Sequence, residues 1–334
     1  MSIRIRILLA VTGVLVLAAA ATVYTSLARH DARTDAAEHS IAVTRAPVTV
    51  GEGLLFFSYN DPGEGQGVVA AVPMTEPLAT RRISQLHCDR FSAASGKAIC
   101  LRPSAAPLPA SEVLILNHEL GELRSVEVPG IPSRAQLSAN GRMASWTTFV
   151  TGDSYARGSF STRSGILDTE TGELIANIED IPLYLDGERH RAMDVNYWGI
   201  TFAGDDDTFY ATVSTGGETH LVRGQVSEWE ARALRSNVEC PSLSADGTRL
   251  VFKKRVHAGN RPWRLHVLDL ATMTERPLAE TSSIDDQVAW LDDNTLAYTK
   301  PAPNDSTNIW SVPADGSGQP RLLVRSASSP STPR

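Results

Sequence analysis

Three short stretches contain residue types that support catalysis in other proteins, but none has the spacing that the chemistry needs. Residues 152–156 read GDSYA, with Ala where a nucleophile elbow has its second Gly. Residues 118–122 read HELGE and lack the second His of a zinc protease. Residues 63–67, GEGQG, fit a hairpin tip, with no helix behind them to hold a phosphate. We therefore predict no catalytic residues and a protein that is not an enzyme.

The cysteines suggest a bridge rather than a reactive site. Cys88 and Cys100 lie a hairpin apart, and adjacent antiparallel strands can bring two Cα atoms within disulfide reach, although not in every register. In an oxidising compartment they could form a disulfide, and two free thiols are the alternative. Cys240 is left over and is interpreted as a small buried hydrophobic side chain. No Cys and His residues cluster with the spacing of zinc ligands.

The first 44 residues differ in composition from the rest. Residues 7–28 contain 22 residues without a charge, enough for a helix to cross a hydrocarbon core of about 30 Å. Arg4 and Arg6 precede this segment and mixed charges follow it, so residues 1–6 should be cytoplasmic and the remainder extracytoplasmic. We expect a single-pass cell-membrane anchor, and a cleaved signal peptide giving a secreted protein is the alternative. Residues 29–44 are interpreted as a polar tether.

The remaining sequence repeats a turn signature. A short strand enters a Gly, Asp or Asn turn and a second strand leaves it, most clearly in CPSLSADGTRLVFKK (residues 240–254) and RAQLSANGRMASWTT (residues 134–148). The spacings between successive turns are 43, 45, 66, 40 and 47 residues. The turn residues are Gly53, Gly96, Gly141, Asp207, Gly247 and Asn294.

Each turn is followed by two further strands, which predicts six units of four strands. Such regular short strands are typical of an all-β, six-bladed β-propeller of antiparallel blades, here over residues 45–326. A sandwich or barrel would not need the same turn six times. The C-terminal residues 327–334, rich in Ser and Pro, are predicted to be disordered. Both ends of the propeller can be interpreted as complete blades, so the way in which the ring closes stays open.

The repeat units resemble a known family. PSLSADGTRLVFKK (residues 241–254) resembles the Pro-x-x-Ser-Pro-Asp-Gly repeat of the TolB-like six-bladed propellers, with Ala245 at the usual position of the second Pro. Together with CDRFSAASGKAICL (residues 88–101) and WRLHVLDLAT (residues 263–272), it is most similar to actinobacterial, membrane-anchored TolB-like proteins. The resemblance implies a bacterial cell-envelope propeller and does not by itself imply a role.

The residue just before each first strand is expected near the mouth of the central channel. A ring of such groups could bind a polar peptide end or a cation. We predict no cofactor, and Ca²⁺ is the one alternative that the carboxylates leave open. Carboxylates near the mouth are weak metal candidates, namely Asp194, Glu239, Asp285 and Asp286. The predicted binding ring consists of Arg45, His87, Ser133, Trp198, Glu239 and Asp286.

The expected partner is a protein or a cell-envelope component. The net charge of −7 disfavours a general nucleic-acid binder, and the part outside the membrane is expected to be monomeric. Two insertions, residues 151–165 and 179–198, interrupt the even spacing and are the preferred contact segments, because binding is concentrated in long loops on rigid scaffolds. The sequence thus favours a non-enzymatic binding scaffold, and a hydrolase or lactonase using a metal held by channel carboxylates is the alternative.

Overall fold

The computed structural model describes residues 41–62, 65–150, 161–259, 261–303 and 306–333, together with Leu17. The chain divides into two compact units, Met1–Ala42 and Val43–Arg334. Apart from Leu17, the predicted anchor at residues 7–28 lies outside the described residues, as does most of the predicted tether. Within the part of the chain that is described, no helix is long and apolar enough to cross a membrane.

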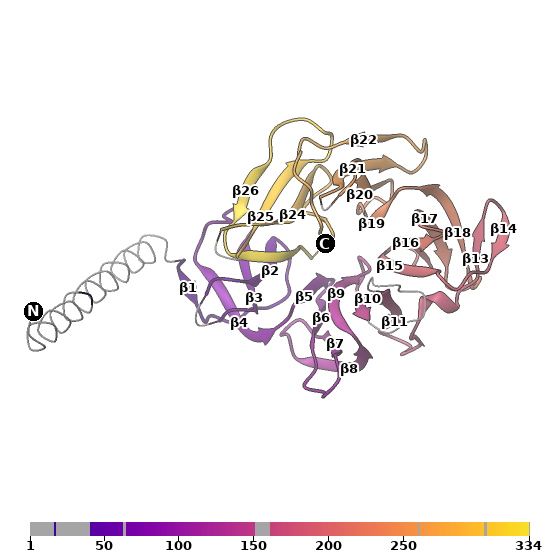
Figure 1. Cartoon of the computed structure of the whole chain (residues 1–334). Helices are drawn as coiled ribbons and strands as arrows, with labels where there is room; N and C mark the ends of the chain where they lie inside the picture. Colours follow the sequence, from indigo (N-terminus) through magenta and orange to yellow (C-terminus); the bar gives the residue numbers. More distant parts are fainter. Residues whose placement is uncertain are drawn as a thin grey trace, which may run out of the picture. The chain divides into compact units, whose positions relative to one another are not determined.

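The unit Val43–Arg334 consists of six sheets around a central channel, which confirms the predicted six-bladed β-propeller (Figure 1). Four of the blades are plain four-stranded antiparallel meanders. These are blade two with β5 (Arg90–Ala94), β6 (Lys97–Pro103), β7 (Ala110–Leu116) and β8 (Glu122–Pro129); blade three with β9 (Ile131–Leu137), β10 (Met143–Val150), β11 (Ser161–Asp168) and β12 (Leu174–Ile175); blade five with β19 (Glu239–Leu243), β20 (Arg249–Arg255), β21 (Trp263–Asp269) and β22 (Glu275–Pro277); and blade six with β23 (Ala289–Trp290), β24 (Thr295–Pro301), β25 (Thr307–Pro313) and β26 (Arg321–Val324).

Blade one closes the ring with the C-terminal end of the chain. Its strands β2 (Leu54–Tyr59), β3 (Val68–Pro73) and β4 (Arg81–His87) follow one another, but its innermost strand is β27 (Ala327–Ser331), which pairs antiparallel with β2. The prediction that residues 327–334 are disordered is therefore wrong for this strand. The turn at Gly53 implied a first strand just before it, but residues 46–50 form no strand because β27 takes that position. On the outer edge, β1 (Val43–Thr44) pairs with β4, so the propeller begins before the predicted boundary at residue 45.

Blade four carries the second predicted insertion. Its meander consists of β15 (Asn196–Phe202), β16 (Thr208–Thr215), β17 (Glu218–Gln225) and β18 (Glu230–Ser236). Before β15, a 3₁₀ turn (Ile178–Asp180) leads into a hairpin of β13 (Leu183–Leu185) and β14 (Glu188–His190). Because β13 pairs with β18, the insertion widens the blade to six strands instead of forming an irregular loop.

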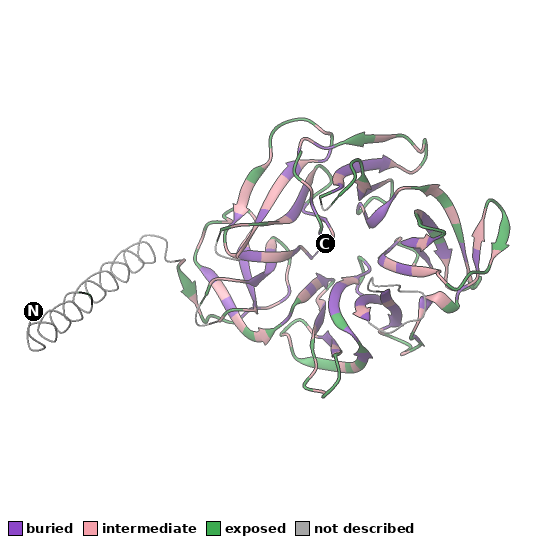
Figure 2. Ribbon diagram, in the orientation of Figure 1, coloured by how far each residue is buried: buried purple, intermediate pink, exposed green. Residues whose placement is uncertain are grey.

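Apolar side chains fill the spaces between successive blades. Phe56 of blade one packs with Phe91 of blade two, and Trp146 of blade three belongs to the cluster between blades two and three. Each blade buries both of its faces against neighbours, which is why central strands such as β6 have runs of apolar residues rather than strict alternation. Figure 2 shows the same arrangement, with buried residues on the inner and middle strands and exposed residues on the outer strands and turns.

The repeated turn has a local chemical basis. In blade five, Ser244 Oγ donates to Asp246 Oδ1, which also accepts from the backbone NH of Thr248. These bonds lower the pKa of Asp246 to about 2, and Gly247 follows at φ 70°, where a residue without Cβ is favoured. The Asp-Gly pair of the best repeat is thus turn chemistry.

Candidate functional site

The innermost strand of each blade alternates between the channel and the spaces between blades. In β9, all four residues from Arg134 to Leu137 border the channel cavity, and Ala135 and Leu137 also belong to the apolar cluster between blades two and three. Alternation of side chains along a strand thus gives the channel a polar lining without interrupting the core.

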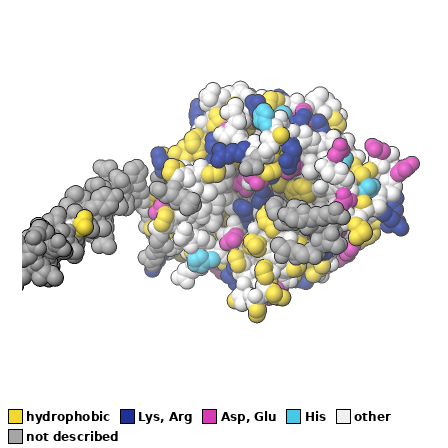
Figure 3. Space-filling view, viewed as in Figure 1, with side chains coloured by type: hydrophobic (Ala, Val, Ile, Leu, Met, Phe, Trp, Pro, Cys, Tyr) yellow, Lys and Arg dark blue, Asp and Glu magenta, His cyan; other side chains and the backbone are white. Residues whose placement is uncertain are grey.

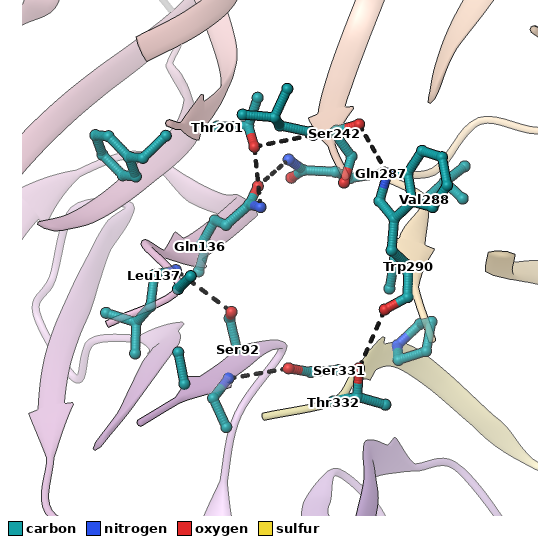
Figure 4. Close-up of a pocket in the computed structure, with 18 of the residues that line it drawn as sticks. Ser92, Gln136, Leu137, Thr201, Ser242, Gln287, Val288, Trp290, Ser331 and Thr332 are labelled. Atoms are coloured by element: carbon teal, nitrogen blue, oxygen red, sulfur yellow. Dashed lines mark hydrogen bonds between the residues drawn. The ribbon is translucent and has the colours of Figure 1, made fainter. Parts of the chain in front are cut away.

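A ring of hydrogen bonds connects all six blades around the channel (Figure 4). Each bond joins one inner strand, or the residue next to it, to the inner strand of the following blade, so the six blades are held in register around the channel. In order around the ring, the NH of Ala93 donates to Ser331 Oγ (2.9 Å), the NH of Leu137 to Ser92 Oγ (3.4 Å), Gln136 Nε2 to Thr201 Oγ1 (3.2 Å), the NH of Leu243 to Thr201 Oγ1 (3.2 Å), Trp290 Nε1 to the carbonyl of Ser242 (3.0 Å) and Thr332 Oγ1 to the carbonyl of Trp290 (3.1 Å).

One further bond crosses the channel. Gln287 Nε2, just before β23 in blade six, donates to Gln136 Oε1 in blade three at 2.7 Å. Blades three and six are opposite each other in a ring of six, so this pair narrows the channel where it crosses (Figure 4). A cavity of about 160 Å³ remains among the inner strands.

A cluster of five charged side chains, here called the charged mouth, lies where the inner strands begin. It consists of Arg90, Arg134, Lys253, Asp285 and Asp286. Lys253 Nζ lies 2.6 Å from Asp285 Oδ1, Arg134 Nη2 lies 4.0 Å from the same oxygen, and Arg90 Nη1 lies 3.7 Å from Asp286 Oδ1. The side chains of Arg134 and Lys253 are only 10% and 4% exposed. Figure 3 shows Lys and Arg side chains beside Asp and Glu side chains near the centre of this view of the molecule.

The pKa shifts in the charged mouth reflect burial opposed by neighbouring charges: burial would lower the pKa of Arg134 and Lys253, but attraction to nearby anionic groups raises both. Burial lowers the pKa of Arg90, repulsion from Arg134 lowers it further, and attraction to Asp286 only partly offsets these effects. Burial would raise the pKa of Asp285, but the attraction of Lys253 and then Arg134 outweighs it and holds that pKa below its usual range. Asp285 is thus held as an anion between two cations.

The predicted binding ring is only partly assembled. Asp286 belongs to the charged mouth, and the carbonyl of Ser133 accepts a bond from Arg134 Nη1 at 2.7 Å. Glu239 is buried and lies 3.3 Å from Arg255, and Trp198 is on β15 with Thr212 as its cross-strand partner.

The other two members of that ring lie elsewhere. Arg45 and His87 line a separate pocket with Ile83 and Leu120, beside the outer strand β4. Arg45 is misplaced because the segment after it is not the inner strand of blade one. His87 is misplaced because it ends β4 instead of starting β5.

The four candidate metal carboxylates are not gathered into one site. Asp194 accepts from Thr215 Oγ1 and the NH of Gly216, so it holds the turn between β16 and β17. The other three are ion-paired with cations, as described above. Among the described residues, no group of three or more His, Cys, Asp or Glu side chains could hold a metal ion.

Of the two outcomes predicted for Cys88 and Cys100, a disulfide or two free thiols, the structure has the disulfide. Cys88 and Cys100 are joined, with their Cα atoms 5.5 Å apart, although Cys88 lies in the connection between β4 and β5 rather than on a strand. Cys240 is a free, buried thiol. Its backbone packs against Gly199, where an added Cβ would lie 2.8 Å from the Cys240 Cα atom.

Sequence reasoning missed the cations and the amide pair. Arg134 and Gln136 occupy the positions i and i+2 of one strand, the periodicity that signals a common face. Lys253 comes from the second strand of blade five, so it could not be found by examining the residues before first strands. Of the first predicted contact segment, residues 151–160 lie outside the described residues and residues 161–165 belong to β11. In the second, residues 179–195 form the blade-four extension and its connection to β15, and residues 196–198 begin β15.

Comparisons with known proteins support the fold. No protein-family model and no curated protein sequence matches the chain. Among solved structures, it is similar to TolB from Acinetobacter baumannii, with a TM-score of 0.59 and 14% identity over 86% of this chain and 68% of that chain. A chain of the nidogen/laminin complex has a TM-score of 0.54 and 15% identity, covering 84% and 98%. An oligogalacturonate lyase in complex with manganese has a TM-score of 0.50 and 12% identity, covering 81% and 73%. Identities this low establish the fold alone, and that fold is the TolB-like six-bladed β-propeller.

Proposed function

We propose that this protein is a non-enzymatic binding scaffold outside the cytoplasmic membrane, held there by its N-terminal segment, and that the charged mouth receives a protein or cell-envelope ligand. The observation that carries the proposal is the charged mouth itself. It places Arg90 and Arg134 at the wall of a cavity, with the buried Lys253 beside them, in a ring that hydrogen bonds connect. A preformed concave site with a few convergent polar groups is the usual form of a binding site.

A connection beside the charged mouth supports the choice of this face of the propeller as the binding face. In an antiparallel blade, the second strand ends where the first begins, so the β20–β21 connection emerges beside the mouth. It follows Arg255, the last residue of β20, and carries the basic residue Arg261. A similar propeller occurs in the nidogen/laminin complex, which supports a protein as the partner.

Site-specific photo-crosslinking in the host cell tests the binding face. A photoreactive amino acid replaces His257, which is exposed in the β20–β21 connection, or Ala271, which is exposed in the β21–β22 turn at the opposite end of the same blade. We expect a crosslinked partner from position 257 and none from position 271. Equal capture from both positions, or none from position 257, would show that the charged face is not the binding face.

The membrane anchor and the absence of catalysis are tested separately. We expect the full chain to stay with membranes during alkaline extraction, and its propeller to be degraded by protease added from outside the cytoplasmic membrane. A metal-dependent hydrolase remains the alternative, because one propeller of this fold is a lyase in complex with manganese. Elemental analysis of the purified full chain should find less than stoichiometric metal, and one tightly bound divalent ion per chain would favour the alternative.

A further inference from the structure

Two guanidinium groups in the charged mouth have buried donors without acceptors. Among the described residues, neither Arg90 Nε nor Arg134 Nε has a hydrogen-bond partner. Arg134 is 8% exposed, and its nearest carboxylate oxygen is 4.0 Å away on Asp285. Because buried donors are nearly always hydrogen-bonded in folded proteins, these donors indicate a place for an acceptor that the described chain does not supply.

The charge balance specifies that acceptor. Three cations make close ion pairs with only two carboxylates, so the close contacts leave one positive charge unmatched. Asp89, the next residue before Arg90, is exposed and attracts Arg90, but forms no close ion pair among the described residues. A buried positive charge without a counter-ion is costly, and a single negative charge at this place would balance it. The acceptor is therefore expected to be a monoanion.

The cavity beyond the cations has amide groups that suit a polypeptide. Gln136 and Gln287 lie deeper in the channel than Arg134 and Asp286, and both line the same cavity as Arg90. Side-chain amides pair well with the donors and acceptors of a peptide backbone. A volume of about 160 Å³ is enough for the end of a chain or one side chain rather than for a folded segment.

We propose that the charged mouth binds a carboxylate of a partner polypeptide, with Arg90 and Arg134 as its hydrogen-bond donors. This inference rests on the proposed binding function and adds the chemistry of the ligand. Guanidinium groups pair with carboxylates in a planar, charge-assisted geometry, which makes the bonds short and strong. A dianionic phosphate would exceed the charge excess and would be repelled by Asp286, so a carboxylate fits better. Both a C-terminal carboxylate and an acidic side chain supply this group.

Peptide probes distinguish these sources with the full chain in mild detergent. Four probes are compared by the change in tryptophan fluorescence, since Trp290 lines the cavity. They are a trialanine with a free C-terminus, its amide, an amidated peptide with one central Glu, and inorganic phosphate. We expect at least one carboxylate peptide to bind tenfold or more tightly than the amide, and more weakly as salt is raised. Equal binding of the amide, or tighter binding of phosphate, would overturn the proposal.

Matched variants link the binding to the named residues. Arg90→Gln should weaken carboxylate binding about tenfold or more, because charge-assisted bonds are lost. Arg232→Gln is the control, since it removes the same charge from an exposed pair with Glu230 on an outer strand and should leave binding unchanged. Asp285→Asn should instead tighten binding, because it removes a competing carboxylate from an exposed position. A merely structural role of the mouth would not give opposite signs for Arg90→Gln and Asp285→Asn.

The outcome also separates this inference from the proposed function. Capture of a partner from position 257 without any preference for carboxylates overturns the inference alone. If the peptides bind as expected but position 257 captures nothing, the mouth binds carboxylates but is not the partner-binding face in cells. If position 257 captures no partner and carboxylate peptides are not preferred, the inference and the proposed function are both wrong.

Discussion

The most informative perturbation is removal of the C-terminal strand. Deleting residues 327–334 removes β27, the innermost strand of blade one, through which the C-terminal end of the chain closes the ring. Besides its ladder with β2, the segment makes further hydrogen bonds to strands or their flanking residues, six of them at 3.3 Å or less. These join Asn60 to Ser328, the NH of Phe91 to Ser329, the NH of Ala93 to Ser331, Thr307 to the carbonyl of Ala327, the NH of Ser329 to Thr299, and Thr332 to the carbonyl of Trp290.

The expected loss is comparable to the stability of a whole domain. At about 1 kcal/mol for each bond, these six contribute roughly 6 kcal/mol, against a typical unfolding free energy of about 5–15 kcal/mol. We therefore expect the truncated chain to lose its cooperative thermal transition, measured by circular dichroism and urea titration. Deletion of residues 333–334, beyond the last of these bonds, is the control and should be neutral. If the longer truncation melts within a few degrees of the full chain with an unchanged urea m-value, the strand does not close the ring.

Three further predictions test the interior. Asp168→Asn should destabilise the protein by about 2 kcal/mol at neutral pH, because Arg142 and two backbone NH groups outweigh burial and hold the pKa of Asp168 at about 2 in the folded state. Because the pKa of Asp168 is lower in the folded than in the unfolded state, its carboxylate stabilises the fold above the unfolded pKa of 3.8, and the stability difference between variant and wild type should vanish as pH falls towards 2. The control is Asp269→Asn, which should lower the unfolding free energy by less, because that carboxylate is exposed and bonded within its own turn. Reduction, or the double variant Cys88→Ala and Cys100→Ala, should cost about 3 kcal/mol in urea unfolding, and failure of non-reducing mass spectrometry to find the linked peptides would contradict the bridge. Cys240 should react with a thiol reagent only after denaturation, and rapid reaction of the native protein would show that it is accessible.

The number of blades could be predicted because the same turn recurs and is held by hydrogen bonds among its own residues. Ser244 and Asp246 form the same turn in blade five that Ser138 and Asn140 form in blade three, so the signature persists while the strands diverge. The closing strand had no such signal. Its sequence, ASSPS, has no apolar alternation, because its serine hydroxyls bond to neighbouring blades instead of filling a core. A strand of this composition cannot be told from a disordered tail by pattern alone.

The charged mouth was only half predictable for a related reason. The prediction took the residue just before each first strand, which found Asp286 but wrongly included Arg45, a residue that lies beside the outer strand β4. The register shifts within β9, β15 and β19, so equivalent sequence positions do not reach equivalent depths in the channel. Lys253 reaches the mouth from the second strand of blade five, and its position in the sequence repeat does not indicate that its side chain lies there.

The exposure of the two carboxylates decides which of them an incoming ligand can displace. Asp285 is 61% exposed and can turn into water when a ligand takes its place beside Lys253, which is 4% exposed and fixed 4.4 Å from the ring of Trp263. The Asp286 side chain is 9% exposed and accepts from the NH of Thr299 at 3.3 Å, so its displacement would leave a carboxylate buried without a partner.

Asp285 is thus the exchangeable carboxylate, and the two Asn variants should differ. Asp285→Asn should tighten carboxylate binding with little change in thermal stability, whereas Asp286→Asn should lower stability, because Arg90 then loses its buried counter-ion. Calorimetric melting and peptide titration of both variants test this. Equal tightening in both, with unchanged melting temperatures, would show that burial does not distinguish the two carboxylates.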